Sequence, residues 1–352
     1  MKPSIKQQQA LLWPVALAVA LYVPISTAAT KSWRTLKIPD CFSAWTLARS
    51  PTGVYVGGAG TDLAPGVWRY QHSRWTRIFD PETSVGTVNA IAADQRGYIN
   101  ATMQGVTYDW SSEVMAYDPA AMTWALRGVG NASVYSALLS AGNALLYAGI
   151  HQLQVPAVWP EVGVLGGFYG TTRFGSFLYE AKGFNTLAAD PYAGIHVAGL
   201  YADTAPPTVA GRPGFWHYSS SQFRAIDLPA YLAEITAITS DGNGVIYLAA
   251  TDANDDGRVW RYSSDGALTD TGLDAEQVKA LATDAQGRIY AGGIDGNLQG
   301  QVWRYAPKTG KWTSLRLKKS AYVNALGVSE NGATIYTIGG DALNVAKLWI
   351  YR

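Results

Sequence analysis

Residues Val278–Leu315 read VKALATDAQGRIYAGGIDGNLQGQVWRYAPKTGKWTSL and contain four short apolar segments separated by turn residues. The first two segments flank the turn 284–287, the third is Gln301–Tyr305, and the fourth begins at Lys311, after the turn 306–310. Alternation with a period of two between turn residues is typical of β-strands. Four such strands in about 40 residues match one blade of a β-propeller.

The same pattern recurs along the chain, and its clearest mark is a third segment that closes on Tyr at intervals of about 45 residues. The copies are VWRY at 67–70, VMAY at 114–117, FWHY at 215–218, VWRY at 259–262, VWRY at 302–305 and LWIY at 348–351. The longer gap between Tyr117 and Tyr218 leaves room for one more unit, with two strands in 134–148 and two degenerate strands in 162–181. The sequence therefore predicts an all-β, seven-bladed β-propeller.

The two ends of the propeller indicate how the ring closes. The segment Lys31–Ile38 resembles a fourth strand, because Trp33 matches Trp75, Trp124 and Trp312, whereas the last unit stops after its third strand. We therefore expect the N-terminal strand of the mature chain to complete the last blade. Closure of this kind removes the exposed sheet edges that favour aggregation.

Residues 1–29 have the pattern of a secretory signal peptide: Lys2 and Lys6, an uncharged stretch 10–25, and small residues before a cleavage site after Ala28 or Ala29. The apolar stretch is short for a membrane anchor and contains two prolines. No later stretch is long and apolar enough to span a bilayer. We expect the propeller to occupy 30–352, in a secreted or periplasmic bacterial protein without disulfides, because Cys41 is the only cysteine.

The composition restricts the partners. Charged residues make up 15% of the chain, its formal net charge is +1, and no basic run occurs, so a nucleic-acid partner is not expected. We expect a monomer that binds a protein or a glycan.

Loop lengths predict where the ligand binds. In a blade, the loops between strands two and three and the connections between blades emerge on one face, and in this chain they are longest in blades 2–4. Loops on a rigid scaffold commonly carry function. We expect these loops to form the binding face through their aromatic residues. The alternative is that some of the rings plug the wide mouth of the channel or fold the long loops back on themselves. The residues are Tyr108, Trp110, Trp159, Phe168, Tyr169 and Tyr201.

Glycine pairs ending strand two, as at 292–293 and 339–340, followed by Tyr and then Trp, resemble Kelch repeats, and Tyr117-Asp-Pro119 through Trp124 matches best. The first strands, such as Ala90–Ile99, are more similar to bacterial sensor-type propellers with an Asp-x-x-Gly turn. The resemblance implies a propeller used for binding. It does not extend to the copper site of galactose-oxidase-like Kelch enzymes, since the four histidines lack metal-ligand spacing.

The repeated Trp and Arg of VWRY have two interpretations. Trp68, Trp260 and Trp303 are expected to pack between blades, and the alternative is a repeated lectin pocket that uses these side chains. His217 stands where other blades have Arg, and we expect it to pack on a blade face rather than to bind a metal.

One loop suggests calcium. Asp252-Ala-Asn254-Asp-Asp256-Gly has the D-x-N-x-D-G spacing of an oxygen-ligand loop, with Ser263 where an EF-hand has Glu. We therefore consider a calcium site at Asp252, Asn254 and Asp256, with an acidic solvated loop as the alternative.

No HExxH, GxSxG or P-loop string occurs, so no enzyme is predicted. The predicted function is a secreted binding module for a protein or glycan. The alternative is a carbohydrate-active hydrolase or lyase with its carboxylates at the channel mouth, which sequence adjacency cannot detect because distant blades would assemble the site.

Overall fold

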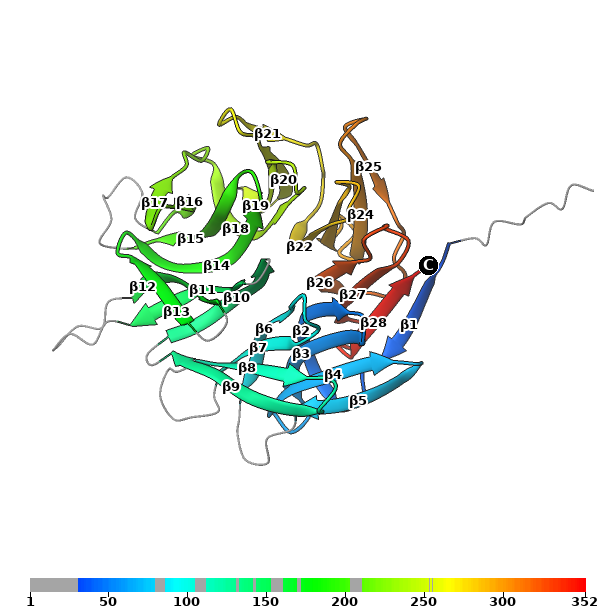
Figure 1. The fold of residues 1–352 in the computed structure, drawn as a ribbon. Helices are drawn as coiled ribbons and strands as arrows, with labels where there is room; N and C mark the ends of the chain where they lie inside the picture. Colours follow the sequence, from blue (N-terminus) through cyan, green and yellow to red (C-terminus); the bar gives the residue numbers. More distant parts are fainter. Residues whose placement is uncertain are drawn as a thin grey trace, which may run out of the picture. The chain divides into compact units, whose positions relative to one another are not determined.

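The computed structural model of the chain describes residues 31–79, 86–104, 112–130, 133–141, 144–152, 161–169, 172–202, 211–252, 254 and 256–352. Within these ranges the regular structure consists of seven four-stranded antiparallel sheets (Figure 1). The described chain therefore forms the predicted all-β, seven-bladed propeller. No helix within these ranges is long and apolar enough to cross a membrane. The predicted signal peptide, residues 1–29, lies outside the described residues.

Each sheet is one blade, and blades are numbered in chain order. Blade 1 comprises β2 (Cys41–Ser50), β3 (Gly53–Gly60), β4 (Pro65–Gln71) and β5 (Arg74–Phe79). Blade 2 comprises β6 (Thr87–Ala93), β7 (Ile99–Gln104), β8 (Ser112–Asp118) and β9 (Thr123–Gly130). Blade 3 comprises β10 (Ser133–Ala141), β11 (Ala144–Gln152), β12 (Glu161–Tyr169) and β13 (Thr172–Leu178). Blade 4 comprises β14 (Ala181–Asp190), β15 (Gly194–Tyr201), β16 (Pro213–Ser219) and β17 (Gln222–Ala225).

The remaining blades follow the same order. Blade 5 comprises β18 (Leu232–Ser240), β19 (Ile246–Asp252), β20 (Gly257–Tyr262) and β21 (Leu268–Asp270). Blade 6 comprises β22 (Gln277–Thr283), β23 (Ile289–Ile294), β24 (Gly300–Ala306) and β25 (Lys311–Ser314). Blade 7 comprises β26 (Tyr322–Val328), β27 (Ile335–Gly340), β28 (Ala346–Tyr351) and β1 (Trp33–Lys37).

Closure by the N-terminal strand is confirmed. Strand β1 pairs antiparallel with β28, with Trp33 opposite Tyr351 and Lys37 opposite Lys347. Figure 1 shows the blue β1 beside the red β28. The last blade therefore draws its strands from both ends of the propeller sequence, and the outer edge of β28 is paired.

The Trp at the start of the fourth strand ties neighbouring blades together. The indole Nε1 of Trp33 donates to the carbonyl of Leu315 at 2.8 Å, and that of Trp312 donates to Oγ1 of Thr271 at 3.1 Å. Both acceptors lie just after the last strand of the preceding blade. In blades 6 and 7, the repeated Trp that identifies the closing strand in the sequence thus donates a hydrogen bond to the residue that follows the last strand of the preceding blade.

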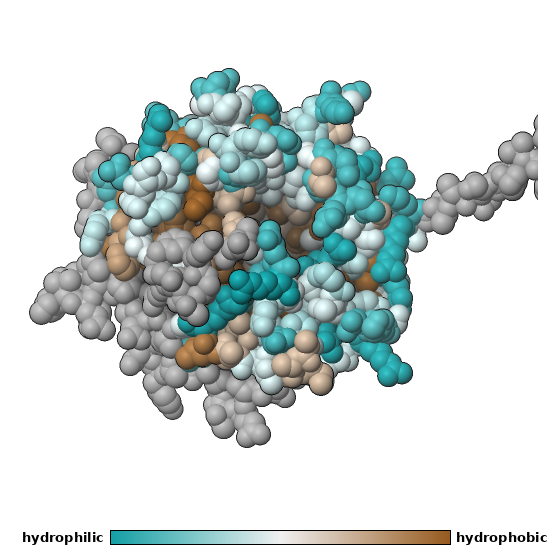
Figure 2. Space-filling view, viewed as in Figure 1, coloured by the Kyte–Doolittle hydropathy of each residue, from teal (hydrophilic) through white to brown (hydrophobic). Residues whose placement is uncertain are grey.

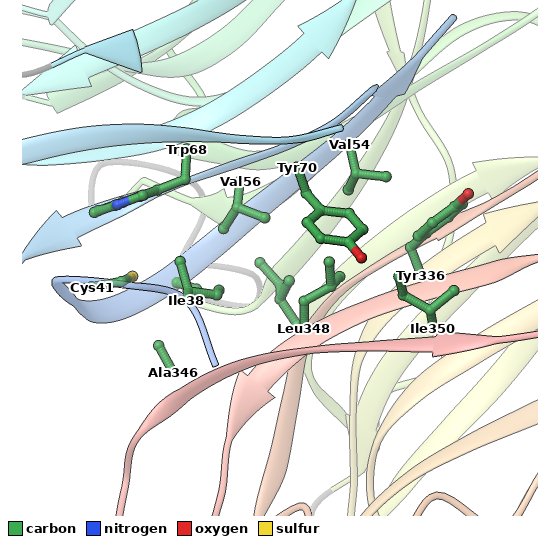
Figure 3. Close-up of a cluster of buried hydrophobic side chains, with 12 residues drawn as sticks. Ile38, Cys41, Val54, Val56, Trp68, Tyr70, Tyr336, Ala346, Leu348 and Ile350 are labelled. Carbon is green, nitrogen blue, oxygen red and sulfur yellow. The ribbon is translucent and has the colours of Figure 1, made fainter. Parts of the chain in front are cut away.

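Apolar side chains fill the spaces between adjacent blades. Figure 3 shows the cluster between blades 7 and 1, where Val56 and Trp68 of blade 1 face Leu348 of blade 7. Trp260 and Trp303 occupy the corresponding clusters on blades 5 and 6. The prediction that these tryptophans pack between blades is confirmed, because all three are buried. A lectin pocket built from them is therefore wrong.

The glycines of strand two are required by irregularities in strand one. All seven innermost strands have a register shift near their start, for example between Ala44 and Thr46 in β2. This shift brings the carbonyl oxygen of Ser43 to 1.9 Å from the position of a Cβ on Gly58, and that of Gln277 to 1.8 Å from a Cβ on Gly293. No side chain fits at that distance, so glycine is required at these two positions. In blades 2 and 5, Met103 and Ala250 occupy the corresponding position beside the same register shift.

Candidate binding face

The connections define two faces of the propeller. Since successive strands of a blade are antiparallel, the hairpins between strands two and three and the connections between blades lie on one side, here called the loop face. The remaining hairpins lie on the other side, here called the turn face. The described hairpins of the loop face are at 61–64, 295–299 and 341–345.

The predicted aromatic residues do not form one described site. Tyr108, Trp110 and Trp159 lie outside the described residues. Phe168 and Tyr169 lie in strand β12, and Tyr201 is the last residue of β15, so their placement in loops is wrong. Phe168 is buried, with its ring centroid 5.7 Å from that of Tyr147. Tyr201 packs on Trp216, with ring centroids 4.9 Å apart.

Phe168 has a structural role that the sequence pattern did not reveal. It pairs with Leu145 as Tyr70 pairs with Val54 in blade 1, so Phe168 takes the place of the closing Tyr of VWRY. Gly166 correspondingly takes the place of Trp68, and a Cβ on Gly166 would lie 2.4 Å from the ring of Tyr147. Tyr147 fills the space that Trp occupies elsewhere, which explains why blade 3 lost the recognisable motif.

The predicted calcium ligands lie in an ordinary five-residue turn. Oδ1 of Asp252 accepts hydrogen bonds from the backbone amides of Asn254 at 2.8 Å and Asp256 at 3.1 Å. Asp295 and Asp341 accept the same pair of amides in blades 6 and 7. Among the described residues no cluster of three or more His, Cys, Asp or Glu side chains has metal-binding geometry. Calcium at this loop stays a prediction.

His196 and His217 face each other on adjacent strands of blade 4, with ring centroids 4.9 Å apart. His196 is 2% exposed. Burial, together with the neighbouring His217, lowers the pKa of His196 to about 4. At neutral pH His196 is therefore uncharged and packs on the ring of Phe215, 5.4 Å away between centroids.

Three leucines project from equivalent hairpins of the loop face, in blades 1, 6 and 7. Leu63, Leu298 and Leu343 are 51%, 70% and 83% exposed. Leu63 and Leu298 have left-handed backbone angles, with φ of 61° and 58°. For a residue with a side chain this conformation costs about 1–2 kcal/mol, and leucine adopts it rarely.

Turns of the same length on the turn face have glycine, rather than leucine, at the left-handed position. The five-residue turns starting at Asp94, Asp241 and Asp284 have Gly97, Gly244 and Gly287 at the left-handed position. Glycine adopts positive φ without steric cost. Leucine at the same position of the same type of turn is therefore unfavourable for the turn itself.

Hydrogen bonds on both sides hold the Leu63 hairpin in this conformation. The amide of Leu63 donates to the carbonyl of Gly60 at 3.0 Å, and the carbonyl of Leu63 accepts the amide of Gly86 at 2.9 Å. In blade 6 the amide of Leu298 donates to the carbonyl of Asp295 at 2.8 Å. A strained residue persists where its surroundings fix it in this way.

Two exposed rings lie on β2, the innermost strand of blade 1, which begins on the loop face. Phe42 and Trp45 of β2 are both exposed. Trp45 is the extra residue at the β2 register shift, and the corresponding residues of the other blades are polar or charged: Asn89, Ser136, Asn185, Thr236, Lys279 and Asn324. Figure 2 shows one face of the propeller, on which hydrophobic residues lie toward the centre, inside a largely hydrophilic rim.

The charges of this region favour an acidic partner. The connection from blade 6 to blade 7 exposes Arg316, Lys318 and Lys319, and none of the three forms an ion pair with a described residue. The carboxylates of Asp62 and Asp341 are instead neutralised by Arg77 at 3.0 Å and Lys347 at 3.1 Å. The hydrogen bond from Arg77 lowers the pKa of Asp62. Arg316, Lys318 and Lys319 are therefore unpaired cations on this side of the propeller, where Asp40 and Asp295 also form no ion pair with a described residue.

Comparison with known proteins identifies the fold and no family. No family model matches the sequence, and no curated protein matches it. Among solved structures, the crystal structure of the WD40 β-propeller domain of Doa1 superposes with a TM-score of 0.65. The two sequences are 10% identical, and the match covers 92% of this chain and 97% of that one. At this identity the comparison establishes the propeller fold alone, and the Kelch resemblance stays a prediction.

Proposed function

We propose that this chain is an exported protein-binding module, and that the loop face over blades 6, 7 and 1 binds an acidic protein segment that carries apolar side chains. The observation that supports this most directly is exposed leucine at strained turn positions, in Leu63 and Leu298. These side chains are exposed and unfavourable for their own turns. Contact with a partner would make them favourable, because burial of a leucine is worth about 1.5–3 kcal/mol.

The surroundings of the leucines define the chemistry of the partner. Leu343, Phe42 and Trp45 extend the apolar surface toward the centre of the propeller. The unpaired cations at Arg316, Lys318 and Lys319 would attract carboxylates and steer association. Large rings at the centre with charges at the rim are typical of protein interfaces. Trp110 and Trp159, which the sequence predicts to bind the ligand, lie outside the described residues and stay predictions.

The test uses short synthetic peptides that combine Glu with Leu and Phe, measured by fluorescence anisotropy. Matched peptides replace every Glu by Lys, or every apolar residue by Ser. We expect binding of the acidic apolar peptides only, and we expect the double variant Leu63→Asn, Leu298→Asn to bind at least about tenfold more weakly, since each lost anchor costs about 1 kcal/mol or more. Asparagine is chosen because Asn344 already adopts the left-handed angle in blade 7.

The matched control is Met122→Ala on the turn face, which removes an exposed apolar side chain that also has a left-handed backbone angle, with φ of 57°. It should leave peptide binding unchanged. Equal binding by the wild type and the double leucine variant would refute the proposed interface, and so would equal binding of the Lys-containing peptides.

A glycan ligand remains the second candidate, because Phe42 and Trp45 offer exposed rings on which a sugar can stack. A glycan array with wild type and Trp45→Ala separates the two. Glycan binding lost in Trp45→Ala, with no peptide bound, would favour the glycan. Release of reducing sugar from a bound glycan would favour the carbohydrate-active enzyme.

A further inference from the structure

A pocket lies on the turn face, in the groove between blades 7 and 1. Its volume is about 540 Å³, within the range of small-molecule sites. Its floor is the end of the inter-blade cluster formed by Val54, Tyr70, Tyr336 and Ile350 (Figure 3). The floor thus offers aliphatic side chains and two phenol rings, while the turns around it provide the rim.

The rim of this pocket is cationic. Arg34 from β1, Arg49 from β2 and Arg352 after β28 line it, together with His72. No Asp or Glu side chain belongs to the lining. None of the three guanidinium groups forms an ion pair with a residue in the described part of the chain. Arg34 and Arg49 therefore have no carboxylate side chain beside them in the pocket, and an anion placed between the two guanidinium groups reduces their repulsion.

The equivalent groove between blades 2 and 3 is a control within the same molecule. It has a similar volume, about 550 Å³, and part of its lining holds the corresponding positions. In the paired strands β8 and β9, Ala125 occupies the position that Arg34 occupies in the paired strands β28 and β1. Asp118 likewise occupies the position of Arg352. There the two arginines, Arg96 and Arg127, are accompanied by Asp94 and Asp118.

The charges in the groove between blades 2 and 3 are balanced. Nη2 of Arg127 lies 3.7 Å from Oδ2 of Asp94. The groove between blades 7 and 1 therefore differs from its counterpart in charge and hardly at all in size. Its excess of arginine does not follow from the architecture of the blade.

We infer that the groove between blades 7 and 1 is a binding site for a small organic anion, in which Arg34 and Arg49 hold a carboxylate or phosphate and Tyr70 and Tyr336 contact an apolar or aromatic body. The planar guanidinium presents paired donors that match both oxyanions. Arg34 lies on the closing strand and Arg49 on blade 1, so the anion joins the two elements at which the ring closes. The site is on the opposite face from the proposed protein interface and is independent of it.

The experiment is calorimetric titration of the full chain with four probes: phenyl phosphate, benzoate, inorganic phosphate and benzylamine. The first two carry the same ring and different anions, so their comparison tells phosphate from carboxylate. Inorganic phosphate lacks the ring, and benzylamine reverses the charge. We expect at least one aromatic anion to bind, more tightly than inorganic phosphate, and benzylamine not to bind. Added salt should weaken the binding.

Three variants distinguish this groove from its counterpart. Arg34→Ala introduces the residue found at the equivalent position in blade 2, and it should weaken the aromatic anion by about tenfold or more, the loss expected for one charge-assisted hydrogen bond. Arg96→Ala in the balanced groove should leave the affinity unchanged. Arg34→Lys keeps the charge without the planar fork and should bind between the wild type and Arg34→Ala.

Three results of these experiments would count against the proposed anion site or part of it. The proposal is overturned if none of the three anions binds at low salt, or if the double variant Arg34→Ala, Arg49→Ala binds as tightly as the wild type. Equal affinity for inorganic phosphate and phenyl phosphate would overturn the role of the aromatic floor. Hydrogen exchange gives a second reading, because a bound anion should slow exchange of the β1 amides and leave those of β9 unaffected.

Discussion

Replacing Ile38 by Ala should destabilise the propeller at the point where the ring closes. Ile38 follows the closing strand, is 0% exposed, and packs in the cluster between blades 7 and 1. The substitution removes three carbon atoms, a transfer term of about 2.4 kcal/mol at about 0.8 kcal/mol each. The cavity that remains adds to this, giving about 3–4 kcal/mol. That is a large fraction of the 5–15 kcal/mol typical of a folded protein.

The assay is equilibrium unfolding in urea followed by tryptophan fluorescence, with Thr35→Ala as the matched control. Thr35 is exposed on the same strand, and its loss should change the free energy of unfolding by no more than about 0.5 kcal/mol. Hydrogen exchange should accelerate first in β1, because its ladder to β28 and this cluster hold the strand. If Ile38→Ala costs no more than Thr35→Ala, or if β1 exchanges no faster than in the wild type, packing at Ile38 does not hold the ring closed.

Three further measurements test individual side chains. Burial lowers the pKa of His196 to about 4 in the folded protein, whereas a histidine in the unfolded chain has a pKa of about 6.5. The unfolded state therefore binds a proton first, and the wild type should lose about 3 kcal/mol of unfolding free energy as the pH falls from about 6.5 to about 4. His196→Phe should lack this component, and identical pH profiles of the two proteins would contradict it. Burial also raises the pKa of the Cys41 thiol to about 12. A thiol reagent at mildly alkaline pH should therefore label Cys41 only after unfolding. Rapid labelling of the native protein would contradict this prediction. The calcium prediction at Asp252, Asn254 and Asp256 requires millimolar calcium to raise the melting temperature of the wild type but not of Asp256→Ala, and an unchanged wild-type melting curve would rule it out.

The sequence determined the blades and the closure because both depend on local patterns. Turn residues and alternation fix each strand within a few residues, and the motif VWRY marks the third strand wherever Trp fills the space between blades. The match of Trp33 to Trp312 was sufficient to predict that β1 completes blade 7, since both indoles make the same kind of hydrogen bond.

Blade 3 shows where this local reasoning failed. Its third strand carries Gly166 and Phe168 in place of Trp and Tyr, and Tyr147 from the neighbouring strand fills the resulting space. The compensation lies on a different strand, so the sequence placed two strands only roughly within 162–181 and assigned Phe168 to a loop as an exposed ring.

Both candidate sites were decided by the tertiary structure. Leucine at 63 and 298 is unremarkable in the sequence, and its significance comes from the left-handed backbone that only the folded turn reveals. Arg34 and Arg49 belong to different blades, and Arg352 comes from the far end of the chain. They line one groove because the ring closes there, and no Asp or Glu side chain lines that groove beside them. A linear pattern records which residues share a strand, whereas the charge and shape of a groove between blades depend on which strands the closure of the ring brings together.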